Sequence, residues 1–377
     1  MSWEIKKLSD CCTSIADGNH QAPPKAVFGV PFVTISNINT YNQFDFTDTM
    51  FVPQEYYDQL DSKRKAQKGD ILYSVVGAFG IPVYMKETVP FVFQRHIAIL
   101  RSNDAILPQF LYYTMLNRDF YMMADAAALG AAQRTVSLTA LRNMKISVPP
   151  MDVQAKIVDT LSAYDDLIEN NQKQIKLLEE AAQRLYKEWF VDLRFPGHET
   201  IPIVDGIPEG WHNAVVTDLL EINYGKDHKV LEDGSIPVYG SGGLMRKVNK
   251  ILHSGECVLI PRKGSLNNII LVNGDFWTID TMFFGVPRRP NVAKYVYLFL
   301  LGIDMYAMNI GAAVPSMTVK ILGGMKVLCP TPEVLEQFEN MVKPFFSMIE
   351  ILKKENESLA DARDLLLPKL MSGEIEV

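Results

Sequence analysis

GAAQRTVSLTALRNMKISVP, at positions 130–149, returns 181 positions later as GAAVPSMTVKILGGMKVLCP, at positions 311–330. The glycine, both alanines, a methionine, a lysine and the last proline stay in register. Upstream, QKGDILYS around Gly69 matches HSGECVLI around Gly255, and Trp3 and Trp211 open the two copies. The repeat predicts one plan used twice, a lobe followed by a helix, which suits a two-fold or bipartite target. Double-stranded DNA is the commonest target of that kind.

The chain of 377 residues is long enough for two or more domains, each with its own core. Short runs rich in Val, Ile and aromatics, such as 30–38 and 256–260, predict strands within each lobe. Each lobe also has one aromatic-rich segment of helical spacing, at 107–117 and 292–304, whose rings are expected to pack in the core rather than stack on bases. We therefore expect an α+β protein with mixed lobes at 1–150 and 196–330 and long helices at 151–195 and 331–377.

The two helical segments each carry a heptad seam, with steps that alternate between four and three residues. This spacing is typical of a left-handed coiled coil. The first seam is Ile157, Leu161, Tyr164, Ile168, Asn171, Ile175, Leu178, Ala182, Leu185 and Trp189. The second seam is Phe338, Val342, Phe345, Ile349, Leu352, Asn356, Leu359, Arg363, Leu366 and Leu370.

Each seam contains one asparagine, at Asn171 and at Asn356. If the helices pack antiparallel with their seams centred, these two residues face each other, and a buried polar pair of this kind fixes the register. Two independent, solvated asparagines are the alternative. Pro344 and Pro368 lie inside the second segment and predict a kink or break there.

The net charge of −7 is spread unevenly along the chain. The lobes are nearly neutral, with 14 basic and 13 acidic residues in 1–150 and 12 of each in 196–330. The helical segments hold 6 basic against 9 acidic residues and 5 against 10. Because DNA affinity comes mainly from neutralised phosphates, the lobes and a more basic partner are expected to contact DNA, not the helices.

Catalytic patterns are missing from the sequence. There is no GxxxxGK[ST] loop, VPPM at 148–151 lacks the residues with which an amino-methyltransferase holds a flipped base, and the six histidines lack metal-ligand spacing. The glycines of IPVYGSGGLM at 236–245 predict a tight turn, and Asp165 and Asp166 are expected on a solvated helix face. We therefore expect no active site, no metal and no cofactor. The four cysteines are interpreted as ordinary thiols, and the lack of a signal sequence or a long apolar run predicts a cytoplasmic protein without membrane contact.

Several strings resemble the DNA specificity subunit of type I restriction-modification systems, and the resemblance extends over essentially the full chain. They are IPVYGSGG at 236–243, VLIPRKGSLNNIILV with FWTIDTMF within 258–283, the GAAQ and GAAVPS segments, and LYKEWFVDLRFPG at 185–197. The resemblance implies two target recognition domains, each of which reads one half of a bipartite DNA site. It also implies that the antiparallel helices act as a spacer and as a dock for two methyltransferase subunits, which restriction subunits then join. Pro344, and a valine at 314 in place of a counterpart to Gln133, depart from the family pattern.

Polar and basic groups in predicted turns are the candidates for DNA contact, since Arg and Lys pair with guanine and Asn with adenine in the major groove. For each of them a solvated surface position is the alternative. The candidates are Lys25, Asn37, Arg64, Lys65, Arg95 and Arg134 in the first lobe, and Lys226, Lys229, Ser241, Arg246, Arg262, Lys263 and Asn267 in the second.

Two other functions remain compatible with these residues. One is a stand-alone DNA-binding regulator that works without an enzyme partner, and the other is a coiled-coil adaptor whose lobes bind protein. The pattern of residues does not determine the DNA sequence that is recognised.

Overall fold

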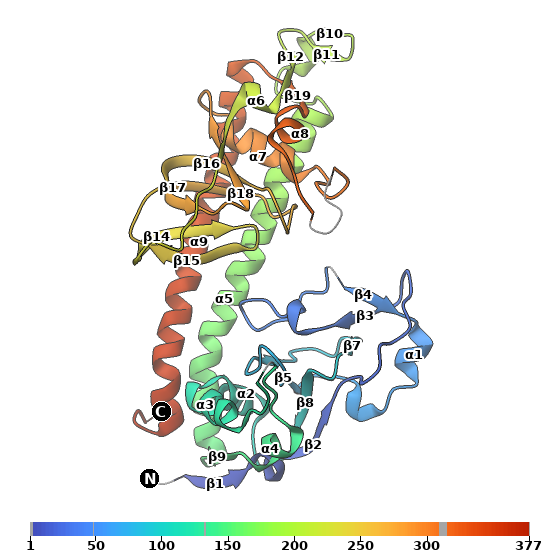
Figure 1. Ribbon diagram of the computed structural model, residues 1–377, viewed down its shortest axis with the longest axis vertical. Helices are drawn as coiled ribbons and strands as arrows, with labels where there is room; N and C mark the ends of the chain where they lie inside the picture. Colours follow the sequence, from blue (N-terminus) through green and yellow to red (C-terminus); the bar gives the residue numbers. More distant parts are fainter. Residues whose placement is uncertain (1–2, 48, 132, 309–314, 377) are drawn as a thin grey trace. The chain divides into compact units, whose positions relative to one another are not determined.

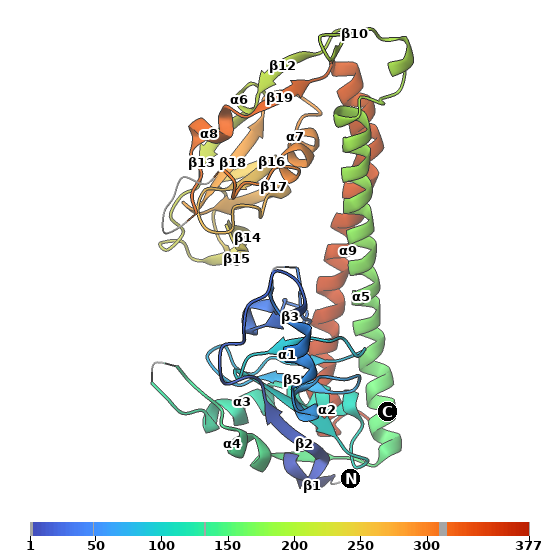
Figure 2. The same cartoon turned by 90° about the vertical axis from the view of Figure 1, so that its right-hand side faces the viewer.

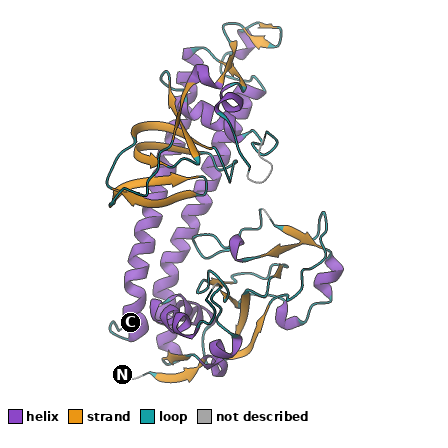
Figure 3. Cartoon of the chain, in the orientation of Figure 1, coloured by secondary structure: helices purple, strands orange, loops and turns teal. Residues whose placement is uncertain are grey.

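The computed structural model describes residues 3–47, 49–131, 133–308 and 315–376, and it divides into two compact units (Figure 1). Unit 1 comprises Met1–Asn170 and Glu355–Val377, and unit 2 comprises Asn171–Lys354. Both contain helices and sheets, so the chain is an α+β protein (Figure 3). The GAAV segment at 311–314 lies outside the described residues.

Unit 1 has three small sheets with the strand orders β1-β9, β2-β8-β5-β6 and β4-β3-β7. Its strands are β1 (Glu4–Lys7), β2 (Cys12–Asp17), β3 (Val30–Val33), β4 (Met50–Val52), β5 (Ile71–Ser74), β6 (Pro82–Tyr84), β7 (Val92–Phe93), β8 (Ile97–Ser102) and β9 (Lys145–Val148). Its short helices are α1 (Gln54–Asp58), α2 (Pro108–Leu116), α3 (Arg118–Ala127) and α4 (Leu138–Asn143).

Unit 2 has a six-stranded sheet of order β13-β18-β16-β17-β14-β15, the pair β12-β19 and the hairpin β10-β11 (Figure 2). Its strands are β10 (Ile203–Val204), β11 (Ile207–Pro208), β12 (His212–Val215), β13 (Leu220–Tyr224), β14 (Asp233–Gly240), β15 (Gly243–Val248), β16 (His253–Pro261), β17 (Ile270–Thr278), β18 (Met282–Pro287) and β19 (Lys326–Cys329). Its short helices are α6 (Val216–Leu219), α7 (Ala293–Leu301) and α8 (Val319–Gly323).

The strand pairing of unit 1 is repeated in unit 2. β8 lies between β2 and β5, as β18 lies between β13 and β16. β3 pairs parallel with β7 and antiparallel with β4, and β14 pairs in the same way with β17 and β15. The internal repeat therefore extends from the sequence to the hydrogen-bond pattern. Unit 1 differs from unit 2 in the connection between β4 and β5, which contains α1 and a 3₁₀ turn at Ser62–Arg64.

The aromatic-rich helices α2 and α7 lie in the cores of their units, as predicted. Phe110 and Tyr113 of α2 are buried in one cluster with strands β5 and β8. Tyr295 and Leu298 of α7 are buried in the corresponding cluster of unit 2. These rings therefore stabilise the lobes by removing apolar surface from water and do not form an exposed stacking platform.

The long helices α5 (Met151–Tyr186) and α9 (Pro332–Ser372) contribute to both units. In unit 1, Ile157 near the start of α5 shares a core with Leu370 near the end of α9. In unit 2, the rings of Trp189 and Phe338 lie 5.6 Å apart, just after the end of α5 and near the start of α9. In unit 1 Asp165 of α5 also accepts a hydrogen bond from Arg363 of α9, and in unit 2 Glu179 of α5 forms an ion pair with Lys353 of α9. Within each unit the two helical segments therefore run antiparallel, while the coiled coil along their full length stays a prediction.

The predicted break at Pro344 or Pro368 does not occur, because α9 continues through both prolines as one helix of 41 residues. A kink at these positions stays a prediction. Burial of Val342 and Phe338 beside Pro344 holds that turn in place despite the lost hydrogen bond, because tertiary packing supplies most helical stability.

Asp165 does not lie on a solvated face. Its carboxylate accepts hydrogen bonds from the Tyr113 hydroxyl and from Arg363 Nη1, both at 2.6 Å. No local pattern predicts this contact, because the three residues are far apart in the chain. Asp166 does lie on the exposed face, where it accepts a hydrogen bond from Lys86 at 2.9 Å. None of the described helices is long and apolar enough to cross a membrane.

Candidate nucleic-acid interface

Several unit 2 candidates converge on Thr281, in the turn between β17 and β18. The backbone N–H of Ser241 donates to Thr281 Oγ1 at 3.4 Å, and that of Arg262 donates to the Thr281 carbonyl at 2.7 Å. Lys263 follows directly and is exposed, while Lys226 donates its backbone N–H to the Thr278 carbonyl at 2.8 Å. Three loops therefore bring Ser241, Arg262, Lys263 and Lys226 to one edge of the sheet.

Three other unit 2 candidates lie near this edge. Arg246 Nη2 donates to the Leu231 carbonyl at 2.6 Å, which ties the loop before β14 to strand β15. Asn267 Oδ1 accepts the backbone N–H of Met305 at 3.0 Å. These two side chains have structural partners inside the unit, whereas the side chain of Lys229 is exposed on the same loop as Lys226.

In unit 1 the candidates Lys25, Arg64 and Arg95 surround the loop that follows β2. Lys25 is exposed within this loop, and the Arg95 backbone N–H donates to the Asn19 carbonyl at 2.9 Å. Arg64 Nη2 lies 3.6 Å from Asp17 Oδ1. Arg64 and Arg95 therefore lie beside the start of this loop, and Lys25 lies further along it.

The other three unit 1 candidates have partners of their own. Asn37 Oδ1 accepts the Thr34 backbone N–H at 2.9 Å and caps a 3₁₀ turn. Lys65 Nζ donates to the Asp58 carbonyl at 2.8 Å. Arg134 forms an ion pair with Asp125 and lies 5.5 Å from the centre of the Phe79 ring, in a part of the lobe away from the loop after β2.

Sequence reasoning missed residues that line a cavity of about 530 Å³ beside Arg64. His20 and Gln21 come from the loop after β2, and Gln59 follows α1. His20 Nε2 lies 2.8 Å from Asp17 Oδ2. The run Gly-Asn-His-Gln follows β2 directly, but no strand was predicted there, so the sequence carried only the run of polar residues as a signal.

The electrostatics of this region are set by burial and by neighbouring charge. Burial lowers the pKa of His96, and the adjacent Arg95 lowers it further. A pKa below the usual 6.5 keeps His96 neutral at pH 7. The cationic charge at the turn between β7 and β8 therefore belongs to Arg95 alone.

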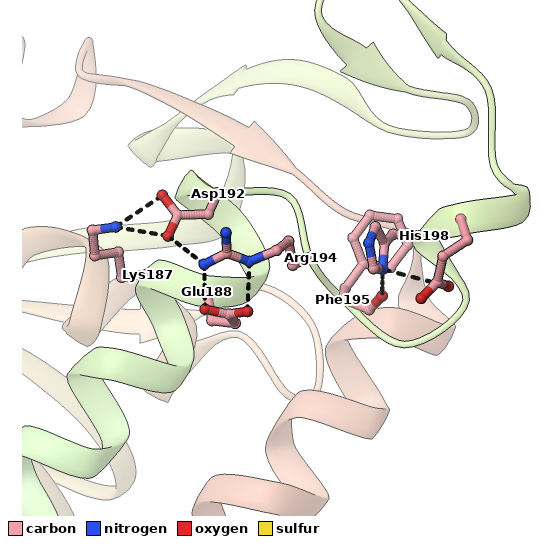
Figure 4. A network of polar contacts seen from close by, with 7 residues as sticks. Lys187, Glu188, Asp192, Arg194, Phe195 and His198 are labelled. Atoms are coloured by element: carbon pink, nitrogen blue, oxygen red, sulfur yellow. Dashed lines mark hydrogen bonds and ion pairs between the residues drawn. The ribbon is translucent and has the colours of Figure 1, made fainter.

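The segment LYKEWFVDLRFPG ends α5 in a compact polar network (Figure 4). Lys187 Nζ donates to both carboxylate oxygens of Asp192, at 2.9 and 2.6 Å, and Arg194 donates to both oxygens of Glu188, at 2.6 and 2.7 Å. The hydrogen bond from Arg194 lowers the pKa of Glu188, and that from Lys187 lowers the pKa of Asp192, so both carboxylates are ionised at neutral pH. The network holds the turn in which Leu193 adopts a φ of 58°.

No cluster of three or more His, Cys, Asp or Glu side chains that could hold a metal ion occurs among the described residues. The four cysteines are free thiols, and burial raises the pKa of Cys257 to about 12. The candidate residues of both units are hydrogen-bond donors and acceptors in turns, the kind of group that contacts phosphates and base edges.

Known proteins that resemble this chain are DNA specificity subunits. The family model for the type I restriction modification DNA specificity domain matches residues 1–180. The MjaIX specificity subunit of Methanocaldococcus jannaschii is 24% identical, with 100% of this chain and 94% of the relative covered. The HindI specificity subunit of Haemophilus influenzae is 21% identical over 91% of this chain and 95% of its own length.

A solved structure has the same fold. The S subunit of a type I restriction-modification system from M. genitalium aligns with a TM-score of 0.55 at 18% identity, covering 98% of this chain and 96% of its own. The family model over residues 1–180 and the full-length relatives thus make this chain similar to the DNA specificity subunits of type I restriction-modification systems.

Proposed function

We propose that each lobe reads one half of a bipartite site in double-stranded DNA. The observation that carries this proposal is the repeated strand pairing of the two units. It gives the chain two lobes of the same architecture, one for each half-site. Their equivalent loops carry different polar side chains, so the two halves of the site differ in sequence. The proposed complex contains two methyltransferase subunits and, in the complete restriction enzyme, restriction subunits.

In this proposal α5 and α9 form an antiparallel coiled coil that sets the distance between the half-sites. The heptad seams and the antiparallel packing within each unit support it. A seam of about 33 residues spans roughly 50 Å at 1.5 Å per residue, which exceeds one turn of DNA.

The proposal also assigns one methyltransferase subunit to each helix. Leu167 of α5 and Met348 of α9 stand 181 positions apart, the offset of the sequence repeat. They are 50% and 45% exposed, each on the surface of its own unit. Equivalent apolar side chains on two repeated helices suit two copies of one protein partner.

A lobe exchange tests the proposed function. Residues 1–150 are replaced by the corresponding lobe of another specificity subunit, and the chimera is expressed with its methyltransferase in a host that lacks DNA methylation. Single-molecule mapping of modified bases should show one half of the motif changed and the other half retained. A change in both halves, or a motif without a gap, would contradict the proposal.

A further inference from the structure

The loops that follow β2 and β13 are anchored in the same way in the two units. A side-chain Cβ at Gly18 would collide with the carbonyl oxygen of Phe93, and one at Gly225 would collide with that of Ile279. The next residue then donates its backbone N–H at 2.8 Å, from Asn19 to Phe93 and from Lys226 to Thr278. Glycine is needed at both positions because only it allows this close approach.

The loops after β2 and β13 carry different side chains. Asn19, His20 and Gln21 follow Gly18, whereas Lys226, Asp227 and His228 follow Gly225. Base edges are distinguished by their pattern of hydrogen-bond donors and acceptors. Two lobes that recognise different sequences therefore need different side chains, which loops of the same backbone conformation can carry. Positions that bind a partner common to both lobes would have no reason to differ in this way.

In unit 1 the loop faces a cavity whose other wall is the excursion between β4 and β5. Asn19 is buried and hydrogen-bonded to the Tyr56 hydroxyl, so the floor of the cavity is fixed. Gln21 and Gln59 are exposed, and within the described part of the chain their side-chain amides make no hydrogen bond. Two glutamine amides thus remain available on a rigid support, beside the Arg64 guanidinium, one nitrogen of which lies 3.6 Å from Asp17 Oδ1. Side chains held on a rigid support favour specific binding.

We infer that this cavity reads bases of one DNA half-site through Gln21, Gln59 and Arg64. The amide of a glutamine can bond the N6 and N7 positions of adenine, and a guanidinium can bond the O6 and N7 positions of guanine. The cavity is open to solvent and has a volume of about 530 Å³. This inference rests on the proposed function, since it names the reading residues of one proposed half-site.

The test uses the assembled complex with its methyltransferase and duplexes that carry the mapped motif, each base pair substituted in turn. The variants are Gln21→Ala, Gln59→Ala and Arg64→Ala. Each should lower the ratio of affinities between the cognate and a singly substituted duplex by roughly 5- to 150-fold, at one or two positions of a single half-site. Ratios at the other half-site should stay as they are in the wild type.

The matched control is Gln67→Ala, which removes an exposed glutamine of the same unit outside the cavity and should leave every ratio unchanged. Unchanged ratios in all three cavity variants would overturn the inference. So would an equal loss at every position, or an assembled variant that binds no duplex, because a single lost base contact weakens recognition without abolishing it. A wild-type motif without two halves would instead refute the proposed function itself.

Discussion

At the scale of single residues, Lys294 is a buried charge that joins three elements of unit 2. Its ammonium group donates to Glu256 of β16 and, at 2.7 Å, to Glu339 of α9. Burial opposes the charged form of Lys294, but the hydrogen bonds to the two carboxylates outweigh burial and raise its pKa above 10.5. The lobe and the helix are therefore held together within unit 2 by an ion cluster as well as by apolar packing.

Substituting Lys294→Met should lower the free energy of unfolding by about 2–4 kcal/mol, because two partly buried carboxylates lose their partner. Denaturant unfolding at pH 7 measures the loss, and Lys343→Met, an exposed lysine on the same surface, should change it little. Since the folded-state pKa is raised, this stabilisation is complete below pH 10.5 and is lost as the pH rises through the folded-state value. Equal stability of the two variants would show that the cluster does not stabilise the unit.

Asn356 is 1% exposed, and neither polar atom of its amide has a hydrogen-bond partner among the described residues. Asn171 is also buried, as a seam position should be, but the register pairing of the two residues stays a prediction. Because an unpaired buried amide costs free energy, Asn356→Leu should raise the free energy of unfolding by about 1–3 kcal/mol. Thermal and denaturant unfolding show whether the substitution raises or lowers the free energy of unfolding. A decrease would instead support pairing with Asn171, whose partner the substitution would remove.

At the scale of elements, the length of α5 should determine the gap of the motif. Insertion of four residues between Asn171 and Ile175 adds roughly 6 Å of helix, or one to two base pairs at 3.4 Å per step. Seven residues would keep the heptad frame and should be tolerated better. Methylation mapping of both insertion variants gives the gap. An active variant with the original gap would show that the helices do not set the distance.

The exposed apolar residues of the long helices should determine how many methyltransferase subunits bind. Leu167→Glu and Met348→Glu each introduce a charge at one of the two equivalent positions. Each single variant should bind one methyltransferase subunit instead of two, and the double variant none, because burying an unpaired carboxylate at an interface is costly. Analytical ultracentrifugation of the purified complexes reports the ratio. Exposed Glu357→Gln of α9 serves as a control that should retain both subunits.

At the scale of the whole molecule, the charge distribution leads us to expect that the partner makes most phosphate contacts and that the lobes read the bases. The lobes have only 26 basic against 25 acidic residues, and the helical segments are acidic. We therefore expect the isolated chain to neutralise few phosphates, with a slope of log K against log salt of about −3 or shallower. Addition of the methyltransferase subunit should make the slope steeper. A steep slope for the isolated chain would contradict this division.

Local periodicity was sufficient to predict the α+β class, the long helices and the buried aromatics of α2 and α7. Each of these depends on the spacing of apolar residues within one segment, and such spacing is visible in the chain itself. The antiparallel direction of the helices does not follow from periodicity and was implied by the family resemblance. Trp189 and Phe338, both predicted seam positions, lie 5.6 Å apart in unit 2.

Only the tertiary structure decided which polar side chains are available for binding. Asn37, Arg246 and Asn267 looked like candidates for DNA contact but have partners within the protein, while Gln21 and Gln59, from different segments, share a cavity. Asp165 was similarly assigned to solvent, yet it accepts hydrogen bonds from Tyr113 and Arg363, 52 and 198 positions away. The partners of a polar side chain come from segments that the fold brings together, so no local pattern in the sequence records them.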